Sequence, residues 1–401
     1  MSVLAEYILF VSYVLIGPVA WGFFGFAIIK GRQRMLLFDQ PYDIPSPAPR
    51  TTILIPAKDE GERVRACLKS VLAQDYPDFQ VIAVNDRSVD QTGRVMDEVA
   101  AEHPSLKVLH IAEGTLPAGW TGKCNALSQA VKHADGRWLL FVDSDAIVAP
   151  GALRKCVAMC ESKDVQLLSL LPKLECHGVW ESLLVPLTGC CVSSMLLVAL
   201  NNNDHLPSIS FANGQFLLIR KDVYDSIGGH AAESIRDKYC EDLAFARMLK
   251  PAGKRVRVSW GTEDLTVRMY SSLSSIFKGW GRNVYAGCLG KPWRILMAMT
   301  FVIYCTYSAY AALGWGVYRL VHPVNAYGAY GWLLAGGVHL GFVVGVLGMV
   351  YSWSGNGRFN GLYFPLSGAM LLGILLKALK MCVTGKVEWR GTTYRHRMSG
   401  I

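Results

Sequence analysis

Two carboxylates that lie one residue apart follow an apolar run in the middle of the chain. Asp143, Ser144 and Asp145 come directly after Leu139–Val142 in the stretch RWLLFVDSDAIVAP. Carboxylate oxygens are the ligands that hard divalent cations prefer, so the pair is a candidate metal site. A polar turn at the end of a buried strand uses the same residue types. The tripeptide alone therefore leaves both interpretations open.

Further polar clusters follow other strand-like segments or begin helix-like ones. PAKDEGE and VNDRSVDQT each follow a short apolar run, and the second contains Asp86. GWTGKCNAL places Lys123 in a glycine-containing loop before a helical segment, and CEDLAFARML places Glu241 and Asp242 at the start of another. Each has a simpler interpretation, such as an Asx turn at Asp86 or carboxylates favoured by the helix dipole. Their recurrence at strand ends favours a common site.

Strand-like and helix-like segments alternate through this part of the chain. Short apolar runs predict strands at 51–57, 79–86, 106–112 and 137–143, and helical spacing predicts helices at 59–75, 91–102 and 124–134. Strands separated by helices form a mainly parallel sheet with helices on both faces. We therefore predict an α/β fold with a doubly wound, mainly parallel sheet. Ligands of such sheets bind beyond the carboxyl ends of the strands, where the polar clusters lie.

The composition predicts a membrane protein. Of 401 residues, 52% are hydrophobic and 18% are charged, whereas soluble domains have about 25% charged residues. Four apolar stretches are long enough to cross ~30 Å of hydrocarbon as helices, and they cover residues 5–30, 295–321, 329–351 and 362–383. The first stretch is too long for the core of a cleaved signal peptide. The net charge of +9 indicates anionic membrane surfaces or substrates, and no nucleic-acid-binding signature is present.

Basic residues after the first stretch indicate the orientation. Lys30, Arg32 and Arg34 place the middle domain in the cytoplasm by the positive-inside rule, with the bacterial inner or plasma membrane as the expected location. We expect an N-terminal transmembrane helix, a cytoplasmic domain, C-terminal transmembrane helices and a basic tail at residues 1–31, 45–285, 294–384 and 385–401. Three C-terminal crossings put the tail outside, whereas its basic residues indicate the inside. The number of these crossings and the side of the C-terminus stay open.

Two apolar segments inside the middle part suit the membrane interface. Gly178–Leu200 is interrupted by Glu181 and Pro186, so we expect a helix that lies in the interface, with a core helix as the alternative. SSLSSIFKGWGRNVYAG combines Trp280 with Lys278 and Arg282, which is also typical of a water–lipid boundary.

The ordered set of motifs resembles family 2 glycosyltransferases with the GT-A fold. The set consists of PAKDEGE, VNDRSVDQT, GWTGKCNAL, VDSDA, FANGQFLLIRKDVYDSIGG and CEDLAFARML. The resemblance covers about residues 50–290, and the flanking apolar helices fit membrane-bound members that act on lipids. GWTGKCNAL, GWGRNVYAG and VEWRGTTY are most similar to hopanoid-associated and carotenoid-type glycosyltransferases.

The resemblance implies a donor and metal site. Asp145 is the implied metal ligand, and Asp143 lies beside it, close to the nucleotide sugar and within reach of the same ion. Mg²⁺ or Mn²⁺ suits hard oxygen ligands, and the favoured donor is a UDP-sugar. Lys123, at a helix start, is expected to meet the diphosphate.

The resemblance also implies a nucleoside pocket. Asp86 is expected to hydrogen-bond the nucleobase or ribose, and Pro56, Ala57 and Glu60 are expected to line the pocket. The family often has Asn where this chain has Asp59, which weakens any role for that position.

The acceptor side follows from the same resemblance. Asp242, beside Glu241, is implied as the base that takes the acceptor proton, with direct displacement and inversion at the anomeric carbon. Asn213–Gln215 resembles the segment beneath the acceptor. Processive polysaccharide synthases of the family carry an Arg-Trp pair after the base, whereas this chain has FKGWGRN. We therefore expect single transfer to a lipid, with Arg282 as a further diphosphate contact or an interfacial anchor.

The sequence thus predicts an inverting, metal-dependent glycosyltransferase (a hexosyltransferase). It would move sugar from a nucleotide-sugar donor to a lipid hydroxyl without processivity, with no nucleic-acid partner and an unknown oligomeric state. The alternatives are a lipid nucleotidyltransferase, a processive polysaccharide synthase, and a non-catalytic membrane scaffold that kept the fold.

Overall fold

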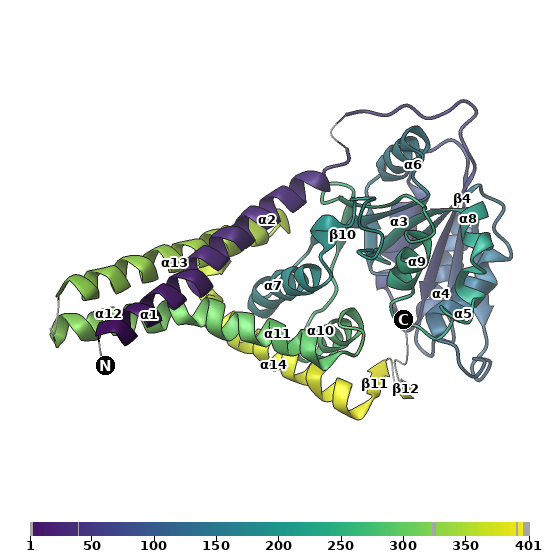
Figure 1. Ribbon diagram of the computed structural model, residues 1–401. Helices are drawn as coiled ribbons and strands as arrows, with labels where there is room; N and C mark the ends of the chain where they lie inside the picture. Colours follow the sequence, from purple (N-terminus) through teal and green to yellow (C-terminus); the bar gives the residue numbers. More distant parts are fainter. Residues whose placement is uncertain (1–2, 39, 323–325, 390–391, 396–401) are drawn as a thin grey trace. The chain divides into compact units, whose positions relative to one another are not determined.

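The computed structural model describes residues 3–38, 40–322, 326–389 and 392–395. Its chain forms two compact units (Figure 1). The sheet unit comprises Arg32–Glu175 and Leu197–Met269, and the helical unit comprises Met1–Gly31, Cys176–Leu196 and Tyr270–Ile401.

The sheet unit is built on a seven-stranded sheet of order β3-β2-β1-β4-β8-β6-β9. Its strands are β1 (Thr51–Ala57), β2 (Phe79–Asp86), β3 (Leu106–Ile111), β4 (Trp138–Val142), β6 (Leu167–Leu171), β8 (Phe216–Arg220) and β9 (Val256–Trp260). Strand β8 runs antiparallel to both neighbours, β4 and β6, and the other neighbouring pairs are parallel. A second sheet of order β5-β10-β7 contains β5 (Ala146–Val148), β7 (Lys173–Leu174) and β10 (Leu265–Val267).

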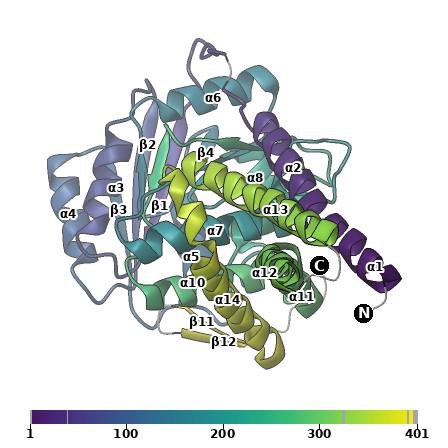
Figure 2. The same ribbon diagram turned by 90° about the vertical axis from the view of Figure 1, so that its left-hand side faces the viewer.

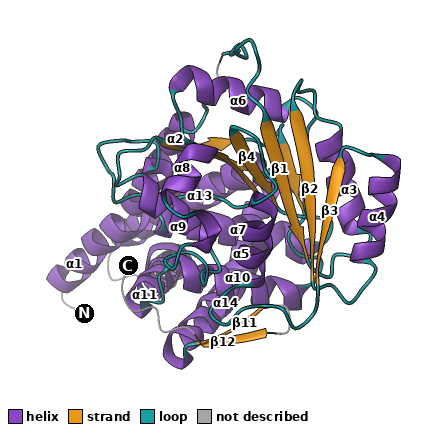
Figure 3. Ribbon diagram, turned by 90° about the vertical axis from the view of Figure 1, so that its right-hand side faces the viewer, coloured by secondary structure: helices purple, strands orange, loops and turns teal. Residues whose placement is uncertain are grey.

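Helices cover both faces of the large sheet. They are α3 (Arg63–Leu72), α4 (Thr92–Glu102), α5 (Gly122–Val131), α6 (Ala152–Lys163), α8 (Lys221–Ser226) and α9 (Glu241–Leu249), with short helices η2 (Val198–Leu200) and η3 (Gly229–Ala231). Side chains of α3, α4 and α6 pack with Ile53 and Ile55 on one face. Side chains of α5 and α9 pack with Leu54 on the other face (Figure 3). The continuous apolar run of β1 follows from this two-sided cover.

The described residues contain four helical segments that are long and apolar enough to cross a membrane, and all of them except the last three residues of the first belong to the helical unit. They are Leu4–Arg34, Pro292–Val321, Gly328–Trp353 and Arg358–Thr384. The elements along them are α1 (Val3–Val14), η1 (Leu15–Val19), α2 (Ala20–Arg34), α11 (Pro292–Val302), η4 (Ile303–Tyr307), α12 (Ser308–Val321), α13 (Ala326–Trp353), η5 (Arg358–Tyr363) and α14 (Phe364–Thr384). Pro18 inside η1 lacks the amide donor of a regular turn, which suits the π-helical turn there.

Polar contacts join these apolar helices. The Glu6 carboxylate lies 3.1 Å from the Arg319 guanidinium, and the Tyr13 hydroxyl lies 3.1 Å from Nδ1 of His339. Pairing of this kind is what ionisable and polar groups need within apolar surroundings.

Two further helices belong to the helical unit, α7 (Val179–Met195) and α10 (Leu273–Gly287). Helix α7 buries Leu183 and Leu187, and the Tyr351 hydroxyl donates to the carbonyl of Leu183 at 2.7 Å. Helix α10 begins after a capping box of Ser272 and Ser275 and packs against α14 (Figure 2). The interfacial positions of both helices stay predictions. A β-hairpin, β11 (Lys386–Trp389) and β12 (Thr392–Arg395), follows α14.

The predicted fold class is confirmed: a mainly parallel α/β sheet accompanied by one N-terminal and three C-terminal apolar helices. The predicted domain boundaries stay predictions. Much of the predicted basic tail, including residues 390–391 and 396–401, lies outside the described residues.

Candidate active site

The candidate site lies at the carboxyl edge of the large sheet. Strands β1, β2 and β4 are parallel, with Thr51 in register with Phe79 and Trp138. Their ends therefore meet at one edge. Asp86 ends β2, and Asp143 directly follows β4. The backbone amide of Asp143 donates to the carbonyl of Gln215 at 3.4 Å, which joins this edge to the segment before β8.

Lys123 is the central cation of the site. Its ammonium lies 2.6 Å from Oδ1 of Asp143 and 2.7 Å from Oε1 of Glu241. It is the second residue of α5, whose N-cap Thr121 accepts a hydrogen bond from the amide of Cys124. This cap ends the preceding loop at a defined residue and holds Lys123 at the helix N-terminus.

The charge of Lys123 is stabilised by its neighbours. Burial on its own lowers the pKa of a lysine. The carboxylates of Asp143, Glu241 and Asp242 outweigh burial here and hold the pKa of Lys123 well above its ordinary value. The lysine is therefore a permanent positive charge at the point where α5 and β4 meet.

Asp242 is held in place by backbone amides. Its Oδ2 accepts from the amide of Gly214 at 2.6 Å, and its Oδ1 accepts from the amide of Leu243 at 2.7 Å. A β-carbon at Gly214 would lie 3.1 Å from Oδ2 of Asp242 and 3.2 Å from the Lys123 ammonium, so the glycine permits this close approach. Burial and the adjacent Glu241 raise the pKa of Asp242 above its ordinary value, which is what a general base near neutral pH requires.

The carboxylate of Asp145 has a buried oxygen without a hydrogen-bond partner among the described residues. This oxygen is Oδ1, and it is shut off from solvent. Burial, followed by the carboxylates of Asp143 and Glu60, raises the pKa of Asp145. A buried carboxylate oxygen without a donor is costly, and a cation would satisfy it.

Protein side chains alone supply few ligands to such a cation. Within the described ranges, three or more His, Cys, Asp or Glu side chains do not gather around a common point that could hold a metal. Mg²⁺ sites commonly use one or two carboxylates and complete their shell with substrate phosphates and water. The residues present fit an ion held in that manner by Asp145 and Asp143.

Asp86 is fixed by the residue that follows it. Arg87 donates to both oxygens of Asp86, at 2.7 and 2.9 Å, and Lys58 donates to the carbonyl of Arg87 at 2.8 Å. A β-carbon at Gly122 would lie only 2.5 Å from Oδ2 of Asp86. Gly122 therefore keeps the start of α5 against the end of β2.

The other predicted nucleoside-pocket residues belong to the same edge. Pro56 and Ala57 end β1 and are in register with Val84 and Asn85 of β2. The amide of Glu60 donates to the hydroxyl of Thr92 at 2.8 Å, which fixes the loop after β1. Arg282 lies on α10 in the helical unit, and its role stays a prediction.

The sequence placed Arg87 in a polar cluster at a strand end but predicted no role for it, and it predicted none for Cys67. Arg87 adjoins Asp86 in VNDRS, so a neighbour with the opposite charge was visible. Cys67 of α3 donates from its thiol to the carbonyl of Asp143 at 3.5 Å, and burial raises its pKa. Its contribution is packing beneath the carboxylates, and the sequence gives no signal for that contact.

Residues 52–228 match the family model described as "Glycosyl transferase family 2", so this part of the chain is similar to family 2 glycosyltransferases. The resemblance predicted from the motifs is thereby confirmed over this range.

Two relatives extend the match. A 4,4'-diaponeurosporenoate glycosyltransferase of Staphylococcus aureus (strain USA300) is 28% identical over 261 residues, which cover 63% of this chain and 65% of the relative. The protein of the same name from strain bovine RF122 / ET3-1 is 26% identical over 356 residues, covering 86% of this chain and 88% of the relative. The first alignment thus spans slightly less than two thirds of the relative.

Among solved structures, the mannosyltransferase PcManGT from Pyrobaculum calidifontis in complex with GDP-Man and Mn²⁺ is similar. The match has a TM-score of 0.47 and 15% identity, covering 92% of this chain and 99% of that one.

Proposed function

We propose that the protein is an inverting, metal-dependent glycosyltransferase that moves one sugar from a nucleotide-sugar donor to a membrane lipid hydroxyl on the cytoplasmic side. The observation that carries the proposal is the Asp143–Lys123–Glu241 arrangement. It puts a permanent cation between two carboxylates at the carboxyl edge of the sheet. The name of the relatives, 4,4'-diaponeurosporenoate glycosyltransferase, supports an apolar, carotenoid-type acceptor for this chain as well. The acceptor in that name is a carboxylate, whereas the acceptor group proposed for this chain is a hydroxyl.

Lys123 and the start of α5 suit the donor diphosphate. Breaking the glycosidic bond leaves a diphosphate whose negative charge grows in the transition state, and a fixed cation stabilises that charge. The helix N-terminus adds amide donors and a favourable dipole. When the donor is bound, we expect the Lys123 ammonium to exchange part of its contact with Asp143 for a phosphate oxygen.

Asp145 and Asp143 suit a divalent ion. A bound Mg²⁺ or Mn²⁺ supplies Lewis-acid neutralisation of the leaving diphosphate. The two carboxylates themselves orient the donor. Asp86 and the ends of β1 and β2 bind its nucleoside. The favoured donor class is a UDP-sugar.

Asp242 suits the acceptor proton. The amides of Gly214 and Leu243 fix its carboxylate in one orientation, and each oxygen keeps a lone pair for an acceptor hydroxyl. In this mechanism the hydroxyl oxygen attacks the anomeric carbon as its proton passes to Asp242. The bond to the diphosphate oxygen breaks on the opposite face, which inverts the centre.

The test uses the full-length chain in lipid nanodiscs with a panel of UDP-sugars and Mn²⁺. Nucleoside diphosphate release and the mass of extracted lipid are measured together. Asp242→Asn should lower transfer by about 10²–10⁴-fold. The matched control Asp97→Asn removes a 59% exposed carboxylate on α4 and should leave the rate unchanged. Wild-type rates in Asp242→Asn would refute the assignment.

The product mass separates the alternatives. One hexose increment per lipid supports the proposal, whereas a nucleotide increment indicates a nucleotidyltransferase. A ladder of sugar increments indicates a processive synthase, and no diphosphate release from any donor indicates a scaffold.

A further inference from the structure

A second pocket lies in the sheet unit, at the edge of the large sheet opposite the carboxylates. It has a volume of about 450 Å³. Its lining includes Val165, just before β6, and Arg255, just before β9. Strands β6 and β4 run in the same direction, because each is antiparallel to β8. The pocket is therefore at the amino ends of strands whose carboxyl edge carries Asp143, and it is separate from the candidate active site.

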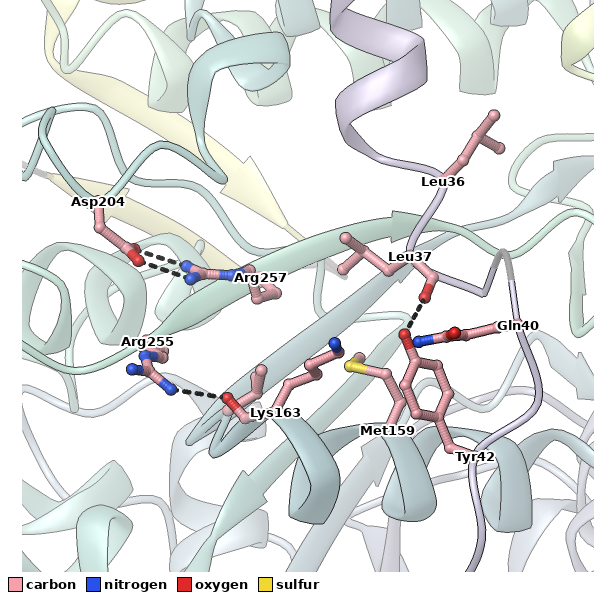
Figure 4. A pocket seen from close by; sticks show the side chains of 10 residues that line it. Leu36, Leu37, Gln40, Tyr42, Met159, Lys163, Asp204, Arg255 and Arg257 are labelled. Atoms are coloured by element: carbon pink, nitrogen blue, oxygen red, sulfur yellow. Dashed lines mark hydrogen bonds and ion pairs between the residues drawn. The ribbon is translucent and has the colours of Figure 1, made fainter.

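The lining carries an excess of positive charge. The lining contains three cationic side chains, Lys163, Arg255 and Arg257, and one carboxylate, Asp204 (Figure 4). Asp204 is already committed, because both of its oxygens accept from Arg257 at 2.7 Å. Asp204 therefore offsets neither Lys163 nor Arg255, and the carboxylate in contact with Arg255 is that of Asp164, outside the lining.

Both of these cations line the same pocket. Arg255 donates to the backbone carbonyl of Lys163 at 2.8 Å. Its guanidinium lies 3.8 Å from the carboxylate of Asp164, which also lies 3.5 Å from the guanidinium of Arg220. The Lys163 ammonium lies 5.7 Å from the centre of the Tyr42 ring, and in the described part of the chain it forms no ion pair. A phosphate group fits such a pair of Lys and Arg donors.

Part of the remaining lining comes from the segment after α2 and includes two leucines. Leu36 and Leu37 line the pocket, and the Tyr42 hydroxyl donates to the carbonyl of Leu37 at 3.3 Å, which closes this segment into a loop. Helix α2 ends at Arg34, the last residue of the candidate span Leu4–Arg34. Two residues of chain reach at most about 7 Å. If α2 crosses the membrane, Leu36 lies at the level where hydrocarbon gives way to headgroups.

We propose that this pocket binds the headgroup of an anionic phospholipid. Its phosphate would contact Lys163 and Arg255, and its glycerol and upper acyl chains would contact Leu36 and Leu37. A soluble phosphate ion would contact Lys163 and Arg255, but it has no apolar part that could pack against Leu36 and Leu37. The site is independent of glycosyl transfer, and it rests on the membrane-spanning role of α2.

The test measures lipid retention by the full-length chain. The protein is delipidated in detergent, titrated with phosphatidylglycerol or phosphatidylcholine, and examined by native mass spectrometry. The wild type should bind phosphatidylglycerol more tightly than phosphatidylcholine. Lys163→Gln/Arg255→Gln should weaken phosphatidylglycerol binding by about 25-fold, from about fivefold per lost cation.

A matched control removes two charges elsewhere in the sheet unit. Lys107→Gln/Lys132→Gln changes exposed lysines on β3 and after α5, and β3 is the edge strand at the other end of the sheet from β9. This variant should bind like the wild type. Lys163→Gln alone breaks no ion pair in the described structure and should still lose about fivefold, which guards against a folding defect in the double variant.

Three results would overturn the proposal. One is wild-type retention of phosphatidylglycerol by both pocket variants, and another is equal binding of the two lipids. The third is displacement of phosphatidylglycerol by inorganic phosphate at equal concentration, which would identify a soluble-anion site instead.

Discussion

Replacing Lys123 by Met removes the cation that holds Asp143, Glu241 and Asp242 together. The ammonium lies 2.6 and 2.7 Å from its two partners. At an effective dielectric constant of about 20, each contact has a Coulomb energy of about 6 kcal/mol before desolvation is subtracted. Breaking a buried pair costs about 3–5 kcal/mol net. The Glu241 side chain is 5% exposed but that of Asp143 is 30% exposed, so we expect the low end, about 3 kcal/mol.

The loss should depend on pH in a defined direction. Burial raises the pKa values of Asp242 and Asp145 above their ordinary values, and the charge of Lys123 lowers both. Without Lys123, these two pKa values therefore rise further above those in the unfolded chain. The folded variant then binds more protons than its unfolded state, and its stability increases as the pH falls. Each additional bound proton changes stability by about 1.4 kcal/mol per pH unit. The deficit of Lys123→Met should therefore shrink between pH 8 and pH 5.

The assay is denaturant unfolding in detergent micelles for wild type, Lys123→Met, Glu241→Gln and the double variant. The two single changes should be non-additive, because Glu241→Gln removes one of the charges that Lys123 offsets. A deficit below about 0.5 kcal/mol, typical of an exposed pair, would refute the reasoning. So would a deficit that grows as the pH is lowered.

Three further predictions concern transfer kinetics. Gly122→Ala puts a β-carbon 2.5 Å from Oδ2 of Asp86. The KM for the donor should therefore rise about tenfold or more, with a smaller change in kcat. An unchanged KM contradicts this prediction. The acid limb of kcat/KM should lie above the ordinary Asp value of 3.8, because the pKa of Asp242 is raised and the base must be ionised to act; activity that persists to pH 4 contradicts it. A chelator should abolish transfer, and adding Mn²⁺ or Mg²⁺ should restore it. Asp145→Asn should weaken Mn²⁺ binding measured by calorimetry. Full activity in the presence of the chelator contradicts a metal role.

The parts of the fold that could be predicted are those with a local pattern. The runs that became β1, β2 and β4 are continuous and apolar, because both of their faces are covered. The four membrane-length helices follow from apolar length alone. Strand β8 carries a similar apolar run, yet its antiparallel insertion between β4 and β6 depends on long-range pairing that periodicity does not encode.

The candidate site was predictable as a set of residue types but not as a set of contacts. The order of the motifs singled out Lys123, Asp143 and Glu241, whereas the ion pairs between them depend on how α5, β4 and α9 meet. The clamp of Arg87 on Asp86 depends on the positive φ of Arg87, 56°, which the sequence does not show. The cationic pocket likewise joins Leu36, Lys163 and Arg255 from segments far apart in the chain.

The central claim is that the protein transfers a single sugar to a membrane lipid, and the mass of that lipid tests it most directly. Lipids are extracted from cells that express the wild type, Asp242→Asn or no copy of the chain, and are compared by mass spectrometry. We expect a lipid with one hexose increment in the wild-type extract, absent from the other two. A lipid profile that is identical in all three extracts, or an increment that persists with Asp242→Asn, would contradict it.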